Sequence, residues 1–307
     1  MKPRVLLAEP LEPAAEARLD ESADVVRPAA SDEAALCARL GDCDALVVRT
    51  RTRVTRELLA AAPKLRVVGV AGVGLDNVDL PAAEARGIRV VHTPEASSDA
   101  VAEFTVGLML SLLRPFGRLA EAYRAGRFHE ARAGGHGVEL RGLCVGIVGM
   151  GRIGSRVARI CAAGFQARVL YNDVADVGPF DFAAERVEKD ELYARSDVVT
   201  LHVPLTDLTR RLVGAGVLAR LKPGAWLVNT ARGELVDLPA LAEALRGGRL
   251  GGAALDVTDP EPAPADHALF GMPNVILTPH AAARTQGGLR RMCAVVDRVL
   301  EALRGGE

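Results

Sequence analysis

The stretch Val145-Gly-Ile-Val-Gly149-Met-Gly151-Arg-Ile-Gly154 decides the fold class of this chain. A GxGxxG pattern is informative when it follows an apolar strand and opens a helix, and here the apolar run Leu143–Val148 precedes a helical pattern. Gly149 permits the tight turn, Gly151 lets a pyrophosphate approach the backbone, and Gly154 allows close packing of helix on strand. The stretch therefore predicts a dinucleotide-binding turn, with the helix N–H groups directed at an anion.

A carboxylate follows this turn at the spacing expected for a ribose contact. Asp173 ends the next strand, 19 residues after Gly154. A carboxylate there accepts hydrogen bonds from the adenosine ribose hydroxyls and repels a 2′-phosphate. No Lys or Arg occurs between Asp173 and Arg186, so the sequence favours NAD over NADP. The alternative interpretation is an ordinary glycine turn followed by a surface aspartate.

Strand-like and helix-like runs alternate from this turn to the end of the chain, which is typical of α/β proteins with parallel sheets. Six strands are expected, the number in a complete dinucleotide-binding sheet. They are Leu143–Val148, Ala167–Asn172, Val198–His202, Ala225–Asn229, Gly252–Asp256 and Val275–Leu277. Helices are expected over Ile153–Gly164 and Leu238–Arg246, and a final one over Gln286–Leu303.

A complete second α/β series precedes the turn. Its expected strands are Val5–Ala8, Val25–Arg27, Ala45–Val48, Val67–Val70 and Arg89–His92, with helices over Glu33–Leu40 and Arg56–Ala62. A long helix from Ser98 to about Tyr123 connects the series, and Gly126–Gly137 is expected to be a surface loop. The prediction is a discontinuous substrate domain, 1–98 plus 284–307, into which a cofactor domain, 99–283, is inserted.

Composition narrows the class of function. The 307 residues are 49% hydrophobic and 25% charged, with a formal net charge of −1 and no basic block, which disfavours nucleic-acid binding. No apolar stretch reaches the length of a bilayer span, so no membrane partner is expected. The five cysteines show no CxxC spacing and are interpreted as reduced thiols of a cytoplasmic protein with no metal site.

Five segments make the chain similar to the D-2-hydroxyacid dehydrogenase family over essentially its whole length. They are Gly72–Asp79, Val148–Gly154, Val228–Gly233, Ala254–Pro262 and Leu277–His280. The resemblance implies two doubly wound parallel-sheet α/β domains: a Rossmann-type NAD domain inserted into a flavodoxin-like substrate domain. It also implies a homodimer and hydride transfer between NAD and C2 of a small 2-hydroxy or 2-keto acid.

The resemblance implies a catalytic Arg, Glu and His at Arg232, Glu261 and His280. Arg232 follows the strand Ala225–Asn229, and its guanidinium can hold a carboxylate and polarise a neighbouring carbonyl. His280 follows Thr-Pro at a strand end and can exchange a hydroxyl proton near neutral pH, while Glu261 bonds its other ring nitrogen. The other histidines considered are interpreted as structural: His92, His129, His136 and His267.

Further positions match cofactor contacts of the family, mostly through the backbone. They are Arg152, Ile153, Val203, Thr230 and Ala231. Asp256 matches the family position that bonds the nicotinamide carboxamide. With Gly149, Gly151, Gly154 and Asp173 they complete the expected cofactor site.

Two segments bear on the substrate. Gly72, Val73 and Gly74 resemble the loop whose backbone N–H groups hold the substrate carboxylate. Arg49 and Arg51 resemble the arginine-containing turn of D-3-phosphoglycerate dehydrogenases, where arginines face the substrate phosphate. The expected substrate pair is therefore D-3-phosphoglycerate and 3-phosphohydroxypyruvate. The alternatives are a glyoxylate or hydroxypyruvate reductase, another D-2-hydroxyacid dehydrogenase, and, in another class, an NAD-sensing corepressor-like binding protein.

Overall fold

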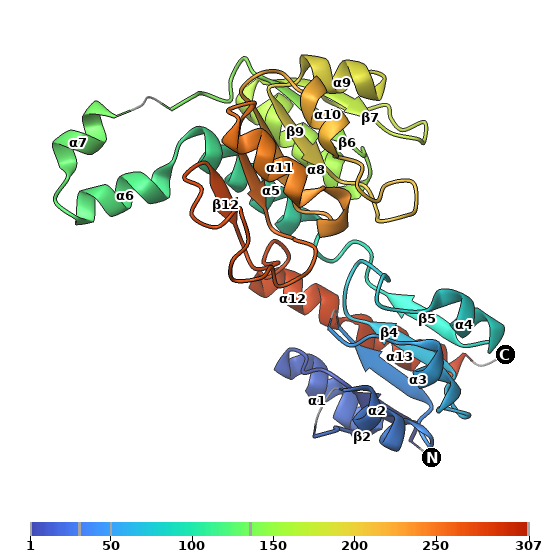
Figure 1. The fold of residues 1–307 in the computed structure, drawn as a ribbon. Helices are drawn as coiled ribbons and strands as arrows, with labels where there is room; N and C mark the ends of the chain where they lie inside the picture. The colour runs from blue at the N-terminus through green and yellow to red at the C-terminus, as the bar shows by residue number, and fades with distance from the viewer. Residues whose placement is uncertain (1, 30–31, 50, 135–136, 306–307) are drawn as a thin grey trace. The chain divides into compact units, whose positions relative to one another are not determined.

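The computed structural model describes residues 2–29, 32–49, 51–134 and 137–305. The chain divides into two compact units, unit 1 (Met1–Ser97 with Ala283–Glu307) and unit 2 (Ser98–Ala282). Each unit contains one parallel sheet (Figure 1). The prediction of two parallel-sheet α/β domains is thereby confirmed.

Unit 1 has a five-stranded sheet in the order β2-β1-β3-β4-β5, the flavodoxin-like order. The strands are β1 (Arg4–Leu7), β2 (Asp24–Val26), β3 (Ala45–Val48), β4 (Val67–Val70) and β5 (Arg89–His92). The helices are α1 (Pro13–Ser22), α2 (Glu33–Leu40), α3 (Arg56–Ala60), α4 (Leu80–Ala85), α12 (Gln286–Cys293) and α13 (Val295–Arg304). The predicted final helix is thus two helices, which meet at Ala294.

Helix α13 packs directly on the sheet of unit 1, although it comes from the other end of the chain. Val295, Val296 and Val299 of this helix are fully buried in one cluster with Val5 and Val47. A Cβ atom at Gly69 in β4 would lie only 2.3 Å from Cγ2 of Val299. The glycine therefore lets the helix approach the sheet more closely than any side chain would allow.

Unit 2 has a seven-stranded sheet in the order β12-β11-β10-β9-β6-β7-β8. The strands are β6 (Cys144–Val148), β7 (Arg168–Asn172), β8 (Glu185–Arg186), β9 (Val198–Leu201), β10 (Ala225–Asn229), β11 (Leu250–Leu255) and β12 (Val275–Leu277). The order reverses between β6 and β9, which is where doubly wound sheets bind their ligands. The sequence prediction of six strands missed β8, because this edge strand has two exposed charged residues and no apolar run.

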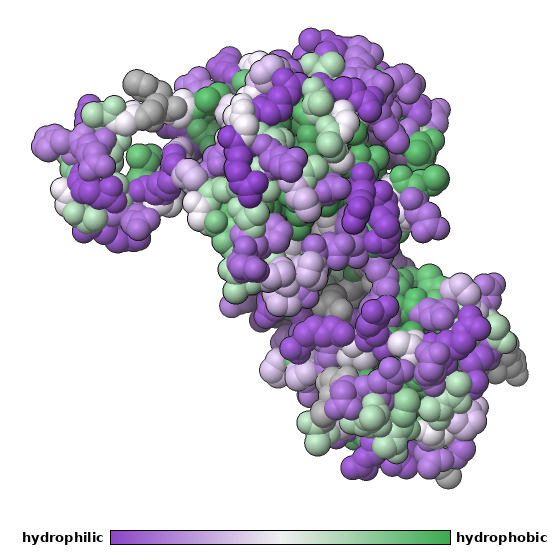
Figure 2. All heavy atoms as spheres, in the orientation of Figure 1, coloured by the Kyte–Doolittle hydropathy of each residue, from purple (hydrophilic) through white to green (hydrophobic). Residues whose placement is uncertain are grey.

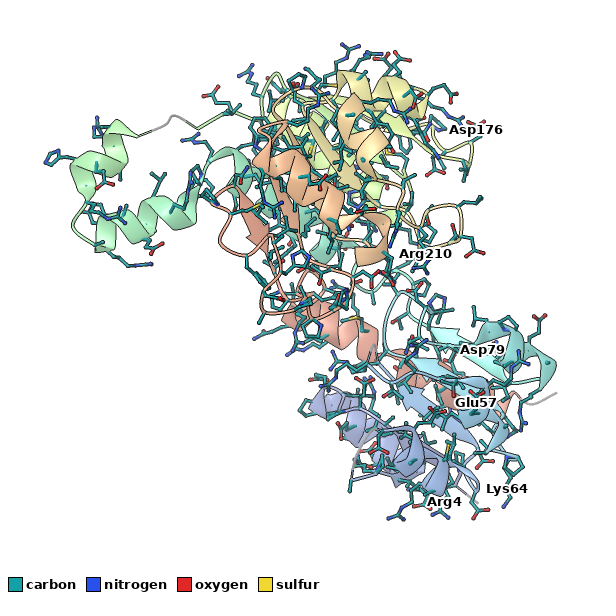
Figure 3. All side chains as sticks on the ribbon, in the orientation of Figure 1. Arg4, Glu57, Lys64, Asp79, Asp176 and Arg210 are labelled. Atoms are coloured by element: carbon teal, nitrogen blue, oxygen red, sulfur yellow. The ribbon has the colours of Figure 1, made fainter. Side chains whose placement is uncertain are left out.

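Unit 2 also contains the helices α5 (Ser98–Leu113), α6 (Phe116–Arg124), α7 (Phe128–Ala133), α8 (Arg152–Arg159), α9 (Lys189–Arg195), α10 (Ala215–Arg220) and α11 (Leu238–Arg246), with a π-helical turn Ile160–Gly164 and a 3-10 turn Gly233–Leu235. The helices other than α6 and α7 cover the two faces of the sheet. Met109 of α5 is fully buried with Val228 of β10 and Ala254 of β11. A polar exterior surrounds these cores, and labelled charged residues such as Asp176 and Arg210 project from unit 2 (Figure 3).

The predicted long helix from Ser98 to Tyr123 is wrong beyond Leu113. The axis bends by 60° between α5 and α6. Pro115 lies at the break. It has no backbone N–H to donate, and its ring disfavours a helical conformation of the residue before it. The predicted surface loop after it is also partly wrong, because it contains α7.

Helices α6 and α7 form an arm that extends away from the sheet of unit 2 (Figure 1). Four large hydrophobic side chains remain exposed on this arm: Phe116 (54%), Leu119 (44%), Tyr123 (66%) and Phe128 (45%). Figure 2 shows hydrophobic residues among the polar ones on it. No single helix within the described residues is long and apolar enough to cross a membrane; only the two helices α5 and α6 together, which are bent by 60° at their break, have that length and composition.

Candidate active site

The glycine turn lies between β6 and α8, at the carboxyl edge of the sheet. Gly149 has φ +92°, and a Cβ atom there would lie 2.6 Å from the carbonyl oxygen of His202. A Cβ atom at Gly154 would lie 2.0 Å from the oxygen of Gly149. Both positions therefore require glycine, as the sequence pattern predicts.

This turn fits the pyrophosphate of a dinucleotide. Gly151 is the N-cap of α8 and has open space where a side chain would lie. The N–H groups of Gly151 and Ile153 donate to no residue in the described part of the chain. Unpaired N–H groups at a helix N-terminus, next to space left by a glycine, are suited to bind an anion.

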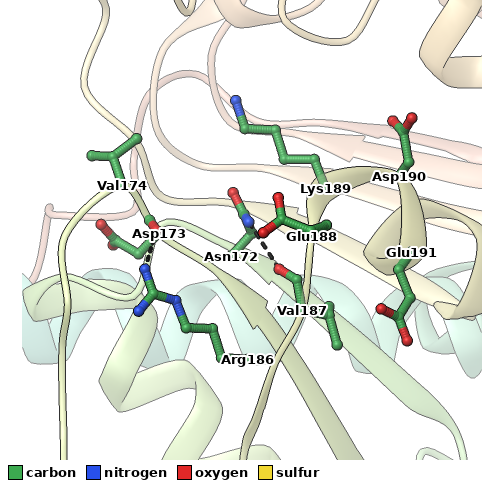
Figure 4. Close-up of a pocket in the computed structure, with 9 residues that line it drawn as sticks. All are labelled: Asn172, Asp173, Val174, Arg186, Val187, Glu188, Lys189, Asp190 and Glu191. Atoms are coloured by element: carbon green, nitrogen blue, oxygen red, sulfur yellow. Dashed lines mark hydrogen bonds between the residues drawn. The ribbon is translucent and has the colours of Figure 1, made fainter.

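Asp173 follows β7 and bonds the glycine turn directly. Its carboxylate accepts hydrogen bonds from the backbone N–H of Met150 at 2.6 Å and of Ala175 at 2.9 Å. The residue lines a pocket of about 780 Å³, which Figure 4 shows with Asn172, Glu188 and neighbouring side chains. A ribose hydroxyl in this pocket would meet a carboxylate that the backbone already holds in place.

Arg186 lies closer to Asp173 than their separation in the sequence indicates. Its Nη2 atom donates to the carbonyl oxygen of Asp173 at 3.2 Å (Figure 4). Its Nη1 atom donates to Asp176 at 2.8 Å. The guanidinium is therefore engaged by the segment that follows Asp173. Four acidic residues line the same pocket against two basic ones: Asp173, Glu188, Asp190 and Glu191 against Arg186 and Lys189. This excess of negative charge disfavours a 2′-phosphate.

His202 was not among the histidines interpreted from the sequence. It follows β9, and its Nε2 atom lies 3.0 Å from the hydroxyl of Thr200. Burial of most of the ring lowers the pKa of His202 to about 3, so the ring is neutral at physiological pH. Its position below the glycine turn, next to Val203, makes it a structural support for the cofactor site.

Arg232 lies in a turn that a buried asparagine folds. Asn229, at the end of β10, donates from Nδ2 to the carbonyl of Arg232 at 2.7 Å and accepts from the N–H of Ala231 at 3.0 Å. The hydroxyl of Thr230 lies 2.8 Å from that of Thr105 on α5. These contacts fix the backbone from which the Arg232 guanidinium projects. Sequence reasoning missed Asn229, whose signal was a polar residue at the end of an apolar strand.

Asp256 directly follows β11 and is 1% exposed. Its Oδ1 accepts hydrogen bonds from the hydroxyl of Thr278 at 2.6 Å and the N–H of Ala281 at 2.8 Å. Its Oδ2 accepts from the N–H of Ala282 at 2.8 Å. Asp256, which is predicted to bind the nicotinamide carboxamide, therefore also holds the side chain of Thr278 before His280 and the backbone of Ala281 and Ala282 after it.

His280 lies in the middle of this turn with φ +50°, a conformation uncommon for a residue with a side chain. Its N–H donates to the carbonyl of Asp256 at 2.8 Å. Its Nδ1 atom lies 2.8 Å from Oε1 of Glu261, the contact expected from the sequence. Because Nδ1 is occupied by Glu261, Nε2 is the ring nitrogen that remains for a substrate proton.

The three expected catalytic residues come from neighbouring strand ends in unit 2. Arg232 follows β10, Glu261 follows β11 and His280 follows β12, and these strands are adjacent in the sheet. Carboxyl ends of adjacent parallel strands meet at one edge. The expected substrate residues Arg49, Gly72, Val73 and Gly74 belong to unit 1. Of the histidines interpreted from the sequence, His136 lies outside the described part of the chain.

In unit 1, the segment with the two arginines is held by buried polar groups. Glu9 is 3% exposed and accepts hydrogen bonds from the N–H of Arg49 at 3.0 Å and of Thr52 at 3.0 Å. Burial alone would raise the pKa of Glu9, but the hydrogen bonds from Thr52 and Arg49 outweigh it and lower the pKa below 4.5. Glu9 also accepts from Nε of Arg51 at 3.4 Å, which engages part of that guanidinium.

Asn77 links the two segments that the sequence assigns to the substrate. Its Nδ2 atom donates to the carbonyl of Arg49 at 2.9 Å and to that of Thr52 at 2.8 Å. Among the described residues, no group of three or more His, Cys, Asp or Glu side chains is arranged to hold a metal ion.

These features define a dinucleotide-binding domain with an Arg, a Glu and a His at its ligand-binding edge. Residues 106–282 match the family described as D-isomer specific 2-hydroxyacid dehydrogenase, NAD binding domain. The chain belongs to this family of oxidoreductases. The predicted cofactor, NAD, is confirmed by the NAD-binding domain of the family.

Relatives in this family carry different substrate names. The chain is 39% identical over 311 residues to D-3-phosphoglycerate dehydrogenase of Methanocaldococcus jannaschii, covering 98% of this chain and 58% of that protein. It is 38% identical over 317 residues to glyoxylate reductase of Korarchaeum cryptofilum, covering 100% of this chain and 94% of that protein. The chain thus spans little more than half of the first relative.

A solved structure resembles the whole chain. It is the NADPH-dependent glyoxylate/hydroxypyruvate reductase of Sinorhizobium meliloti in complex with NADP and malonate. Its TM-score is 0.91 at 33% identity, covering 100% of this chain and 95% of that one.

Proposed function

We propose that the protein is an NAD-dependent D-2-hydroxyacid dehydrogenase whose catalytic residues are Arg232, Glu261 and His280. The observation that carries the proposal is the His280–Glu261 pair, with Nδ1 and Oε1 2.8 Å apart, beside the strand end that bears Arg232. A histidine fixed through one ring nitrogen and a guanidinium on an adjacent strand are the two groups that hydride transfer at C2 requires.

Each residue has a distinct task. Bound NAD supplies the hydride acceptor. During oxidation of the hydroxy acid, His280 takes the hydroxyl proton at Nε2, and it returns that proton during reduction. Glu261 holds the ring through Nδ1 and stabilises the protonated imidazole that forms. Arg232 binds the carboxylate and stabilises negative charge on the C2 oxygen.

For the substrate pair we propose D-3-phosphoglycerate and 3-phosphohydroxypyruvate. The support is the pair Arg49 and Arg51, whose guanidinium groups can bind a distal phosphate. The side chain of Arg51 is 82% exposed even though Glu9 accepts from its Nε atom. Gly72, Val73 and Gly74 would bind the carboxylate at the other end of the substrate.

A glyoxylate or hydroxypyruvate reductase is the second candidate. One observation favours it: Glu9 is an ionised carboxylate against Arg51, so the segment carries less net positive charge than its two arginines indicate. Relatives with the glyoxylate reductase name also match nearly the full length of this chain.

NADH oxidation with a panel of 2-keto acids distinguishes these candidates. The panel contains 3-phosphohydroxypyruvate, hydroxypyruvate, glyoxylate and pyruvate. The proposal expects kcat/KM to be at least about tenfold higher with the phosphate than with hydroxypyruvate, the effect of one charge-assisted contact. Arg49→Leu should bring the ratio of these two kcat/KM values close to one. Arg86→Leu, which changes an arginine elsewhere in unit 1, should leave the ratio unchanged. Equal rates with and without phosphate would support the reductase instead.

An NAD-sensing binding protein is the alternative of another class. It would bind NADH without turning over any keto acid in the panel.

We propose a cytoplasmic enzyme, for which the support is that all five cysteines are free thiols.

We also propose that the protein is a homodimer, paired through the α6–α7 arm. The support is the run of exposed side chains Phe116, Leu119, Tyr123 and Phe128 on an arm that leaves its own sheet. A second copy would cover these aromatic and aliphatic groups.

A further inference from the structure

His92 bonds the loop that is proposed to hold the substrate carboxylate. It ends β5, and its Nδ1 atom lies 2.9 Å from the carbonyl oxygen of Val73. A carbonyl oxygen can only accept, so Nδ1 carries the hydrogen in this contact. Thr93 makes a second link, because its N–H donates to the carbonyl of Gly72 at 3.1 Å and its hydroxyl lies 3.3 Å from the same oxygen.

These two contacts fix two consecutive peptide planes. In a trans peptide, the C=O of one residue and the N–H of the next point in opposite directions. The carbonyls of Gly72 and Val73 point toward the end of β5, so the N–H groups of Val73 and Gly74 point away from it. Neither N–H donates to any described residue. The loop thus presents two adjacent unpaired donors in a fixed direction.

The backbone of His92 is held by a hydrogen bond from helix α13. Nη1 of Arg298 on α13 donates to the carbonyl of His92 at 2.7 Å. The loop is also held at its far side, where Asn77 bonds the carbonyls of Arg49 and Thr52. Reorienting the Val73–Gly74 peptide would therefore require the His92 contact to break.

We propose that His92 is a positioning residue for substrate binding: its ring sets the direction of the N–H groups of Val73 and Gly74, which receive the substrate carboxylate. This inference rests on the proposed function, in which that loop binds the 2-keto acid. Charge-assisted hydrogen bonds depend strongly on donor direction, so a free peptide plane would bind the carboxylate less well. His92 does not touch the substrate in this scheme.

Two variants separate the hydrogen bond from the bulk of the ring. His92→Leu keeps a side chain of similar size but removes the donor. His92→Asn keeps an N–H donor at nearly the same distance from the backbone as Nδ1. With the best keto acid of the panel, His92→Leu should raise its KM roughly tenfold, with kcat and the KM for NADH within about twofold of the wild type. His92→Asn should restore most of the affinity.

His267→Leu, which changes a histidine of unit 2 whose ring bonds the N–H of Leu269, is the matched control and should leave both KM values unchanged. A KM that rises equally in the Asn and Leu variants, or in neither, would overturn the role of His92. So would an equal rise in the KM for NADH, which indicates general damage. A wild-type protein that reduces no keto acid would instead overturn the proposed function, whatever the His92 variants do.

Discussion

Oε1 of Glu261 lies 2.8 Å from Nδ1 of His280, whose backbone is in a left-handed conformation. The Asp256 carboxylate holds the residues on both sides of the turn. The histidine is therefore oriented twice, through its ring and through its backbone, and one ring nitrogen remains for chemistry.

Replacing His280 by Gln should lower kcat by about 10²–10⁴-fold, the usual contribution of a positioned acid or base. Binding of NADH, measured by fluorescence titration, should change little, because no hydrogen bond of His280 reaches the glycine turn. The control is His267→Gln. His267 lies between β11 and β12, and its Nδ1 atom accepts a hydrogen bond from the N–H of Leu269. Turnover that survives in His280→Gln would remove this residue from the mechanism.

Thr278→Val should reduce kcat roughly tenfold by loosening the turn that holds His280. The change is nearly isosteric and removes only the hydroxyl that donates to Asp256 at 2.6 Å. Thr278→Ser keeps the donor and should recover most of the activity. If Asp256 served the cofactor alone, Thr278→Val would raise the KM for NADH and leave kcat intact.

Asp173→Ser should weaken NAD and improve NADP as a cofactor. The carboxylate repels a 2′-phosphate, and its loss leaves Arg186 and Lys189 in the same pocket. We expect the ratio of kcat/KM for NADP to that for NAD to rise at least roughly tenfold. Asp181→Ser, which changes a carboxylate paired with Arg159 outside this pocket, is the control. A wild-type enzyme that already prefers NADP would contradict the role of Asp173.

Acid should destabilise unit 2 through His202. The pKa of His202 is about 3 in the folded protein and 6.5 in an ordinary environment. At a pH between these two values the histidine is protonated in the unfolded chain and neutral in the folded one. Stability therefore falls as the pH drops from 6.5 toward 3, by up to about 2 kcal/mol at pH 5 from this group. Urea unfolding of His202→Gln should show a smaller loss between pH 7 and pH 5 than the wild type. His129→Gln should lose as much as the wild type does.

Leu119→Glu in the α6–α7 arm should convert the proposed dimer to a monomer. A charge placed in an apolar contact remains unpaired and desolvated. Light scattering after gel filtration gives the mass directly. Leu80→Glu, at a similarly exposed position in unit 1, should remain dimeric. A wild-type protein that elutes as a monomer would contradict the proposal.

Local patterns predicted much of the fold. The strands Ala45–Val48, Val67–Val70, Arg89–His92 and Ala225–Asn229 and the helix Leu238–Arg246 have the expected bounds, because each combines a strong period with clear end signals. Pro115 indicates a helix break, but the apolar residues at helical spacing up to Leu113 led to the prediction of one continuous helix. Strand β8 could not be predicted, since its two residues pair only through the backbone of β7.

The site was predictable where a motif carries the chemistry, as at Gly149 and His280. Groups that act through the backbone left no such signal. Asn77 and Glu9 bond peptide groups that are distant in the sequence. Asn229 bonds peptide groups of its own turn, and these become its partners only once the turn has folded. His92 was interpreted as structural for the same reason: its partner is a carbonyl, and a carbonyl has no side-chain identity to recognise.

The close contact between Gly69 and Val299 has a consequence for synthesis of the protein. Residues 2–97 are translated with five strands but without α13, which shares one face of the sheet with α1, and all of unit 2 must be translated before α13 appears. During that interval the part of the sheet that Val295, Val296 and Val299 cover lacks this helix. Unit 1 therefore finishes folding only after unit 2 has been translated, and a premature stop shortly before α13 would leave its sheet open to aggregation.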